Sequence, residues 1–300
     1  ATTGMDSAVN RLFITGVSPV TMDDVTSGFN IGTNITTDPW FNDLVGFSER
    51  EWREMLTYYK EQGALPMSVD DAVTMMKPNY DNYCFSENKL ADCMFNSDMV
   101  LYCMKSLILH GVKPDEIVDP NIRTDFNKLA YLVRLDHGLG ENFSVIKEIA
   151  EQGEIVTEIV THFSALEMTD VGNFKSLLFY FGLLSIKGVD MMGRPILHIP
   201  NLVVREQLFN FLIQGYARHD IFKLDVNRLR TLFENMSFKG DWKPLFEFLA
   251  EAIREQSRIR EYIEGEAHIK GFLLAYLSMF RYYQLYPEYE MNKGFADFFF

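Results

Sequence analysis

The stretch Gly265 to Phe300, GEAHIKGFLLAYLSMFRYYQLYPEYEMNKGFADFFF, decides the fold that we expect for the C-terminal part of the chain. Its first half has the apolar spacing of a long amphipathic helix. Two β-rich runs follow, and a tight turn is expected between them at Asn292-Lys293-Gly294. The second run holds a single carboxylate, Asp297, among aromatic residues. Because an acid is normally excluded from so apolar a strand unless it binds something, Asp297 is the first candidate functional residue.

Composition limits the class of protein. The 300 residues carry a formal net charge of −14. This balance argues against broad, charge-driven binding to nucleic acid, because phosphate contacts need Lys and Arg. The longest apolar runs, at 176–186 and 271–280, are shorter than the ~20 residues of a membrane span, and the N-terminus has no signal-peptide pattern. We therefore predict a soluble, cytoplasmic protein without membrane partners.

Three cysteines, Cys84, Cys93 and Cys103, are too widely spaced in the sequence for a CxxC metal knuckle. Their odd number and the predicted cytoplasmic location favour reduced, partly buried thiols. The histidines show neither HxH nor HExxH spacing, so a metal site built from them is not expected.

The N-terminal region begins with a short apolar run, 11–17, that is typical of a buried parallel strand. A lone parallel strand cannot fold, so we expect that partner strands precede it in the gene. Residues 18–42 are rich in Ser, Thr, Asn, Asp and Gly and predict a long surface loop.

Helical patterns dominate from Ser48 onward. Ser48 and Glu51 form a capping box, and Ser68 starts a second helix. Residues 80–95 predict a hairpin around Ser86-Glu87-Asn88-Lys89. Further helices are expected to begin at Ser97, at Asn201, at Asp225 and, with Asp241 as the cap, near Pro244. Residues 115–153 are expected to be mainly helical, with a strand over 154–160.

Residues 169–200 predict a helix, a strand at 184–189, a turn at 191–194 and a strand at 195–199. Helix followed by hairpin is the plan of a winged helix. A DNA-reading helix needs a basic face, but this one carries only Lys175, which favours a structural role.

Several segments together resemble one family. Six segments are similar, in chain order, to the Bacteroidetes-type family of AAA-ATPase-like proteins with a C-terminal PD-(D/E)XK nuclease-like domain. These segments are RLFITGVSPVTMDDVTSGFNIGTN, VGFSEREW, DPNIRTDFNKL, NFKSLLFYFGLLSIKG, EQSRIREYIEGEAHIKGFLLAYL and YPEYEMNKGFADF. The sequence has no G-x-x-x-x-G-K-[ST] loop to hold a triphosphate, and no E-x-K follows Asp297 before Phe300. The resemblance thus implies a fragment without the P-loop and the E-x-K motif.

The resemblance implies three regions. Residues 1–45 are expected to be the C-terminal edge of the ATPase core, residues 46–250 a helical lid with a winged-helix-like middle region, and residues 251–300 the first helix and hairpin of the nuclease-like domain. The fold class expected is mainly α with β-hairpins (α+β), ending in the start of an α/β nuclease-like fold.

The resemblance also assigns candidate sites. Asp297 corresponds to the acid that holds Mg²⁺ or Mn²⁺; the alternative is an exposed acid that protects an edge strand from aggregation. Glu266, beside His268, corresponds to a first-helix acid that reaches the metal site in some nucleases, or else is an ordinary surface residue. Thr15 stands where a sensor residue touches ATP, although a Thr before Gly at a strand end is common. Glu288 and Glu290 are weaker candidates on the first strand.

The function implied is that of a protein that binds and hydrolyses ATP and cleaves DNA with a divalent metal, in which the lid passes its movement to the nuclease through residues 200–265. The 300-residue chain alone is expected to be inactive. The alternative is a non-catalytic, nucleotide-gated sensor or scaffold whose degenerate nuclease module serves for docking. The sequence does not predict an oligomeric state.

Overall fold

The computed structural model describes residues 33–114, 141–218 and 224–255, the backbone of two strands between 286 and 299, and single positions at 13, 15, 16, 118 and between 273 and 283. The described chain is mainly helical with small antiparallel sheets, which confirms the predicted class. Its helices are α2 (Glu49–Glu61), α3 (Val69–Tyr80), α4 (Ser97–His110), α6 (Glu141–Gln152), α7 (Val171–Tyr180), α8 (Leu202–Arg218), α9 (Val226–Lys239) and α10 (Lys243–Glu255). Its strands are β1 (Glu154–Val156), β2 (Ser185–Val189), β3 (Pro195–His198), β4 (Tyr286–Met291) and β5 (Gly294–Phe299).

Two apolar cores organise these elements. The smaller core lies between α2, α3 and α4 and contains Trp52 and Phe95, both fully buried. The larger core joins α6, α7, the three-stranded sheet and α8 to the pair α9 and α10, with Phe174 and Phe233 among its fully buried residues. Both cores are mostly built by residues at helical spacing, which is why the helices were predictable from the sequence.

The first helices begin at the residues that the sequence predicts. The Ser48 side chain accepts a hydrogen bond from the backbone of Glu51, and the Glu51 carboxylate accepts one from the backbone of Ser48. The Ser68 side chain caps α3 by accepting a hydrogen bond from the Asp71 backbone. The predicted cap of α4 is wrong by one residue, because Asn96 caps this helix and not Ser97.

The middle unit has the predicted order of helix and hairpin. Helix α7 precedes β2 and β3, which pair antiparallel, and β1 adds to the free edge of β3 in the order β1-β3-β2. The strand predicted at 154–160 is shorter than expected, since only 154–156 pair with β3.

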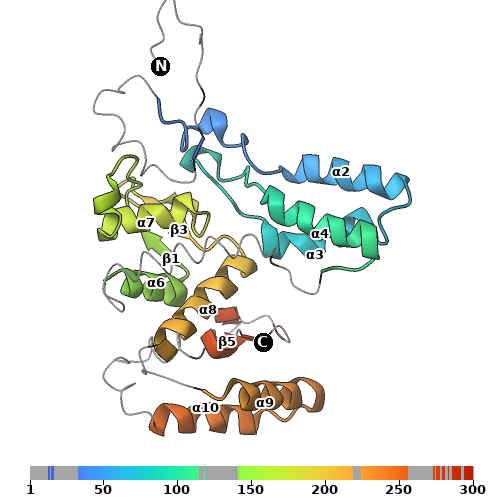
Figure 1. The fold of residues 1–300 in the computed structure, drawn as a ribbon, viewed down its shortest axis with the longest axis vertical. Coiled ribbons are helices and arrows are strands. Elements are labelled where there is room, and N and C mark those ends of the chain that lie inside the picture. The colour runs from blue at the N-terminus through green and yellow to red at the C-terminus, as the bar shows by residue number, and fades with distance from the viewer. Residues whose placement is uncertain are drawn as a thin grey trace, which may run out of the picture.

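Helices α9 and α10 lie side by side at one end of the molecule (Figure 1). Asn201 accepts a hydrogen bond from the Val204 backbone at the start of α8, as predicted. The helix predicted from Asp225 is confirmed, with Asp225 itself as the cap of α9. Helix α10 begins at Lys243, so the predicted cap Asp241 lies one residue too early.

The region of residues 80–95 differs from the predicted hairpin. It forms isolated bridges, Tyr83 with Met94 and Phe47 with Phe95, around a short 3₁₀ turn at Glu87–Lys89. The bridge places the centre of the turn one residue later than predicted. This region also joins the two cores, because the Ile186 backbone of β2 donates to the carbonyl of Cys84 at 3.1 Å.

The N-terminal strand is not found at the positions described. Phe13, Thr15 and Gly16 are exposed and belong to no strand, and no described strand runs beside them to pair their backbone groups. The remaining residues of 11–17, most of the loop 18–42 and most of 115–140, within the region expected to be mainly helical, lie outside the described residues.

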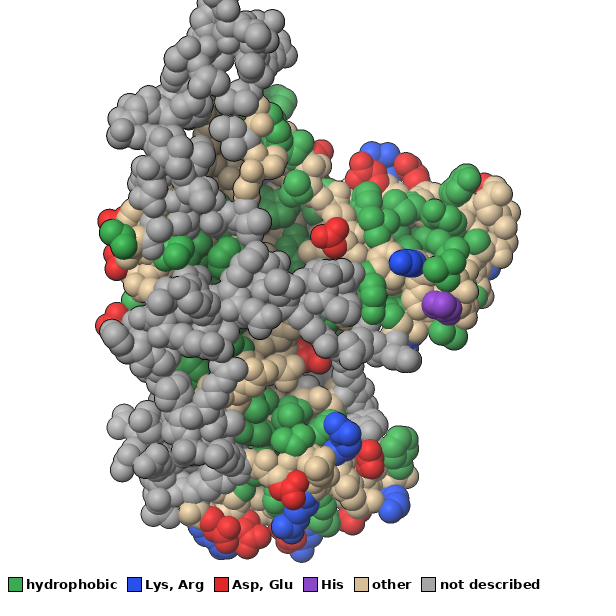
Figure 2. Space-filling view, viewed as in Figure 1, with side chains coloured by type: hydrophobic (Ala, Val, Ile, Leu, Met, Phe, Trp, Pro, Cys, Tyr) green, Lys and Arg blue, Asp and Glu red, His purple; other side chains and the backbone are tan. Residues whose placement is uncertain are grey.

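Apolar side chains also gather on the surface over α2–α4 (Figure 2). Tyr58, Leu101, Leu109 and Val112 are among the exposed ones. None of the helices in the described parts of the chain combines the length and the hydropathy that crossing a bilayer requires.

Candidate functional site

The C-terminal hairpin carries Asp297, the first candidate functional residue of the sequence analysis. Strands β4 and β5 pair antiparallel, with Pro287 opposite Phe298 and Tyr289 opposite Ala296. Because no register shift separates these pairs, Asp297 lies opposite Glu288. The predicted strand–turn–strand order is therefore confirmed.

The register decides between the two weaker candidates on β4. Glu288 shares a cross-strand position with Asp297, whereas Glu290 is opposite Phe295. Two like charges at opposite positions of an antiparallel pair repel each other. A divalent cation removes that repulsion, and carboxylate oxygens are the ligands that Mg²⁺ and Mn²⁺ prefer. The residue types in this register thus fit a divalent metal.

The other predicted residues are not brought to the hairpin by the described structure. Glu266 and His268 lie outside the described residues. Thr15 is described, exposed and not part of a strand. Among the side chains that the structure does describe, no group of three or more His, Cys, Asp or Glu residues is arranged to hold a metal.

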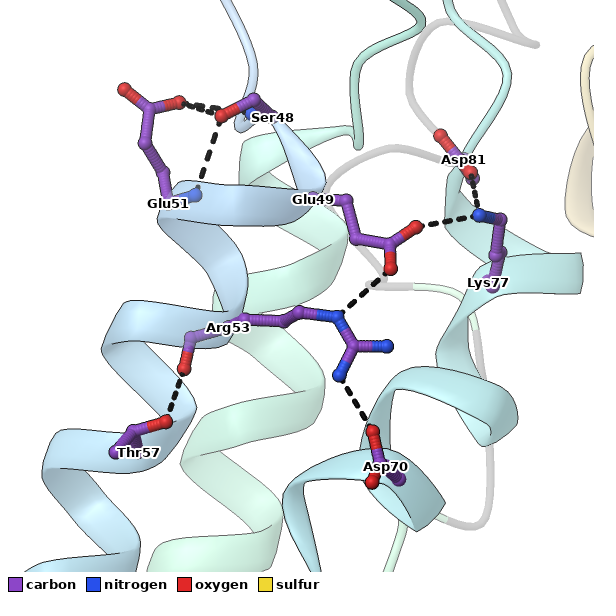
Figure 3. Close-up of polar contacts among 8 residues, drawn as sticks. All are labelled: Ser48, Glu49, Glu51, Arg53, Thr57, Asp70, Lys77 and Asp81. Atoms are coloured by element: carbon purple, nitrogen blue, oxygen red, sulfur yellow. Dashed lines mark hydrogen bonds and ion pairs between the residues drawn. The ribbon is translucent and has the colours of Figure 1, made fainter.

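A second candidate site is a pocket of about 610 Å³ beside the start of α2 and the end of α3. Charged residues of both signs line it, and a polar network connects them (Figure 3). Lys77 Nζ donates to Glu49 Oε2 at 2.6 Å and lies 3.8 Å from Asp81 Oδ2. The other Glu49 oxygen accepts from Arg53 Nε at 2.9 Å, and Arg53 also reaches Asp70 at 2.7 Å. Hydrogen bonds from Lys77, and then from Arg53, lower the pKa of Glu49.

Asp81 is the unusual member of this network. The residue is only 5% exposed, and its Oδ1 atom has no hydrogen-bond partner among the described residues. Burial raises the pKa of Asp81, although the backbone of Asn82 and the Lys77 ammonium act in the opposite direction. A buried carboxylate with an unpaired oxygen and a raised pKa, beside a pocket, can accept a hydrogen bond or a proton from a polar ligand.

Contacts from distant parts of the chain bury Asp81. Its backbone carbonyl accepts a hydrogen bond from the Asn201 side chain at 3.1 Å. The next residue, Asn82, has a left-handed backbone with φ of 73°, and its side chain donates to the Pro200 carbonyl at 3.0 Å. Sequence reasoning missed this site. The only local signal was a Lys and an Asp four residues apart at a helix end, which is common on exposed helices.

Comparisons with known proteins bear on the hairpin alone. Residues 264–300 match the family model described as the PD-(D/E)XK nuclease superfamily. No curated protein and no solved structure matches the chain. The match covers the hairpin and the segment before it, so this part of the chain is similar to a nuclease-type module of the PD-(D/E)XK superfamily.

Proposed function

We propose that residues 264–300 contribute to a metal-dependent nuclease site, and that Asp297 is a ligand of its Mg²⁺ or Mn²⁺ ion. The observation that carries the proposal is the position of Asp297. It lies on the second strand of the hairpin that the nuclease family model matches, opposite a second acid, Glu288. PD-(D/E)XK nucleases generally use divalent metals, which agrees with this pair of oxygen donors.

Each residue has a proposed task. Asp297 binds and orients the metal, and Glu266 supplies a further carboxylate from the preceding segment. When bound, the ion polarises the phosphodiester and lowers the pKa of a bound water. The ion also offsets the net charge of −14 locally, which lets DNA approach an acidic chain.

The remaining regions are assigned by the family resemblance. We propose residues 1–45 as the edge of an ATPase core, with Thr15 as its sensor of bound ATP, residues 46–250 as the lid and residues 251–300 as the nuclease-like part. The order α7, β2, β3 supports a winged-helix-like unit within the lid. In this proposal, movement of the lid passes through residues 200–265 to the nuclease, so nucleotide changes the rate of cleavage by the full-length protein.

The competing proposal is a nucleotide-gated sensor or scaffold that has lost catalysis and uses the hairpin for docking. The excess of acidic residues favours it, because a docking module needs no phosphate contacts. The two proposals differ in what lies after Phe300: the nuclease requires an E-x-K triplet on the next strand, and the scaffold does not.

The test starts with the coding sequence after Phe300 and continues with plasmid cleavage by the full-length protein in Mn²⁺. We expect Asp297→Ala to abolish cleavage. Glu247→Ala, which removes an exposed acid of α10, serves as the matched control and should cleave normally. Undiminished cleavage by Asp297→Ala would overturn the assignment of the metal ligand, and a full-length protein that does not cleave would favour the scaffold.

A second expectation concerns the 300-residue chain itself. With no P-loop and no E-x-K in its sequence, it should neither hydrolyse ATP nor cleave DNA when purified. Either activity, if it survives further purification, would contradict the prediction that this chain lacks working ATPase and nuclease sites.

A further inference from the structure

Two of the three cysteines meet in the structure although nine positions separate them in the sequence. Tyr83 and Met94 exchange both backbone hydrogen bonds, at 3.1 and 2.8 Å. Cys84 and Cys93 follow this isolated bridge on the side of the turn, at the position where an antiparallel pair would have no backbone hydrogen bonds between its two residues. Cα atoms of such pairs are about 4.5 Å apart, which is within the range of about 4.4–6.8 Å that a disulfide requires.

The side chains confirm that the two thiols share one space. The interaction between the two thiols is the largest cause of the lowered pKa of Cys84 and of the raised pKa of Cys93. Both also point into the turn between them, since Cys84 Sγ is 3.1 Å from the Ser86 carbonyl oxygen and Cys93 Sγ is 3.4 Å from the Leu90 carbonyl oxygen. No comparable partner thiol exists for Cys103, which lies in the core of α2–α4.

We propose that Cys84 and Cys93 form a redox modification site, at which a low-molecular-weight disulfide such as oxidised glutathione converts the two thiols into a cross-strand disulfide. Cys93 is the point of entry, because it is partly exposed and lines the 610 Å³ pocket, whereas Cys84 is only 1% exposed.

The chemistry balances in two exchange steps. Cys93 Sγ attacks one sulfur of oxidised glutathione while the Cys84 thiolate accepts the Cys93 proton, which forms a mixed disulfide and releases one glutathione thiolate. The Cys84 thiolate then attacks Cys93 Sγ, forms the internal disulfide and releases the second glutathione thiolate. The two cysteine protons end on the two glutathione molecules, and the two electrons reduce the reagent.

The local electrostatics support the reaction. The hydrogen bond from Cys93 lowers the pKa of Cys84 to about 7, against the burial that raises it. The first proton lost by the pair therefore leaves Cys84 near neutral pH. The contact with Cys84 and burial raise the pKa of Cys93, so the Cys84 thiolate is the base that takes the Cys93 proton. By contrast, burial raises the pKa of Cys103 to about 11, which keeps this thiol protonated and unreactive.

The site also lies where the two cores join. Cys84 N–H donates to the Ser185 hydroxyl at 2.7 Å, and its carbonyl accepts from Ile186 N–H at 3.1 Å. A disulfide here closes the turn that forms one wall of the pocket, and the two Cys84 backbone hydrogen bonds connect this turn to the start of β2.

The experiment treats the folded 300-residue chain with oxidised glutathione and then counts free thiols and maps disulfides by peptide mass spectrometry. We expect two of the three thiols to disappear, a Cys84–Cys93 cross-link, and full reversal by dithiothreitol. The control Cys103→Ala should form the same cross-link. In Cys93→Ser, the two remaining thiols should stay reduced, because Cys84 has lost both its partner and its route to the reagent.

Several results would overturn the proposal. These are a wild-type chain that keeps all three thiols, a glutathione adduct that persists on Cys93 without a cross-link, or a disulfide that includes Cys103. Modification of Cys84 in folded Cys93→Ser would also contradict entry through Cys93. Far-UV circular dichroism of each variant verifies that the comparison is made on folded protein.

Discussion

Replacing Gly215 with alanine separates the helical preference of a residue from the packing around it. Gly215 lies inside α8, where alanine is normally favoured by about 1 kcal/mol. In this structure, however, an added Cβ atom would lie 2.4 Å from Cε2 and 3.0 Å from Cζ of Phe143 on α6. The Phe143 ring is 5% exposed and packs against two rings of α8: Phe211, with ring centroids 6.2 Å apart, and Tyr216, at 5.6 Å. The ring therefore has little room to move away.

Overpacking of a well-packed core typically costs about 1–3 kcal/mol, which is more than the helical preference returns. We therefore expect Gly215→Ala to lower the free energy of unfolding by up to about 2 kcal/mol, measured by urea denaturation and circular dichroism. The control is Gly172→Ala in α7, where the added Cβ atom meets nothing within 4 Å and alanine should be neutral or stabilising. In a Phe143→Leu background, Gly215→Ala should cost less. A Gly215→Ala chain as stable as the Gly172→Ala chain would refute the packing of α6 on α8.

Three further predictions follow from the local structure. Asn96→Ala should lower the free energy of unfolding by about 1 kcal/mol in the same denaturation assay, while Ser97→Ala should change it little, because Asn96 is the cap of α4. A larger loss in Ser97→Ala than in Asn96→Ala would instead support Ser97, the cap that the sequence predicts. Asp81→Asn should stabilise the chain near neutral pH. Burial raises the pKa of Asp81, so the carboxyl favours folding below its ordinary pKa and loses this contribution as pH rises through the pKa of the folded state. The difference in unfolding free energy between Asp81→Asn and the wild type should therefore grow from pH ~4 to ~7. A difference that does not change with pH would contradict the raised pKa. Oxidation of Cys84 and Cys93 should raise the free energy of unfolding by about 2–3 kcal/mol through closure of a short loop, and an unchanged urea midpoint would indicate a strained bridge.

The local signals of the sequence predicted much of the fold. The caps at Ser48, Ser68 and Asp225 were correct because each depends on contacts within one helical turn. The cap of α4 was misplaced by one residue, because Asn96 and Ser97 are neighbouring polar residues of types that both cap helices. Helix α10 begins at Lys243, one residue later than a cap at Asp241 predicts.

Sequence reasoning failed where distant segments meet. A turn centred on Ser86–Lys89 pairs Cys84 with Ala91, whereas the Tyr83–Met94 bridge pairs it with Cys93. A shift of the turn by one residue therefore concealed the cysteine pair. The burial of Asp81 was equally unpredictable, because it depends on Asn201.

The C-terminal site was predictable in part. The hairpin was expected from its turn residues and is confirmed, whereas the metal-binding role of Asp297, inferred from an acid within an apolar strand, stays a prediction. The pairing of Asp297 with Glu288 needed the register, because a slip of one residue would have placed a different side chain opposite.

The most direct test of the central claim is a Mn²⁺ titration of the full-length protein, followed by electron paramagnetic resonance. We predict that Asp297→Asn weakens Mn²⁺ binding by at least about tenfold, because even residues that only support a metal ligand typically contribute that much. Glu247→Gln should bind as the wild type does. Equal Mn²⁺ affinity in the wild type and in Asp297→Asn would contradict the account, because Asp297 would then be an edge-strand acid and not a metal ligand.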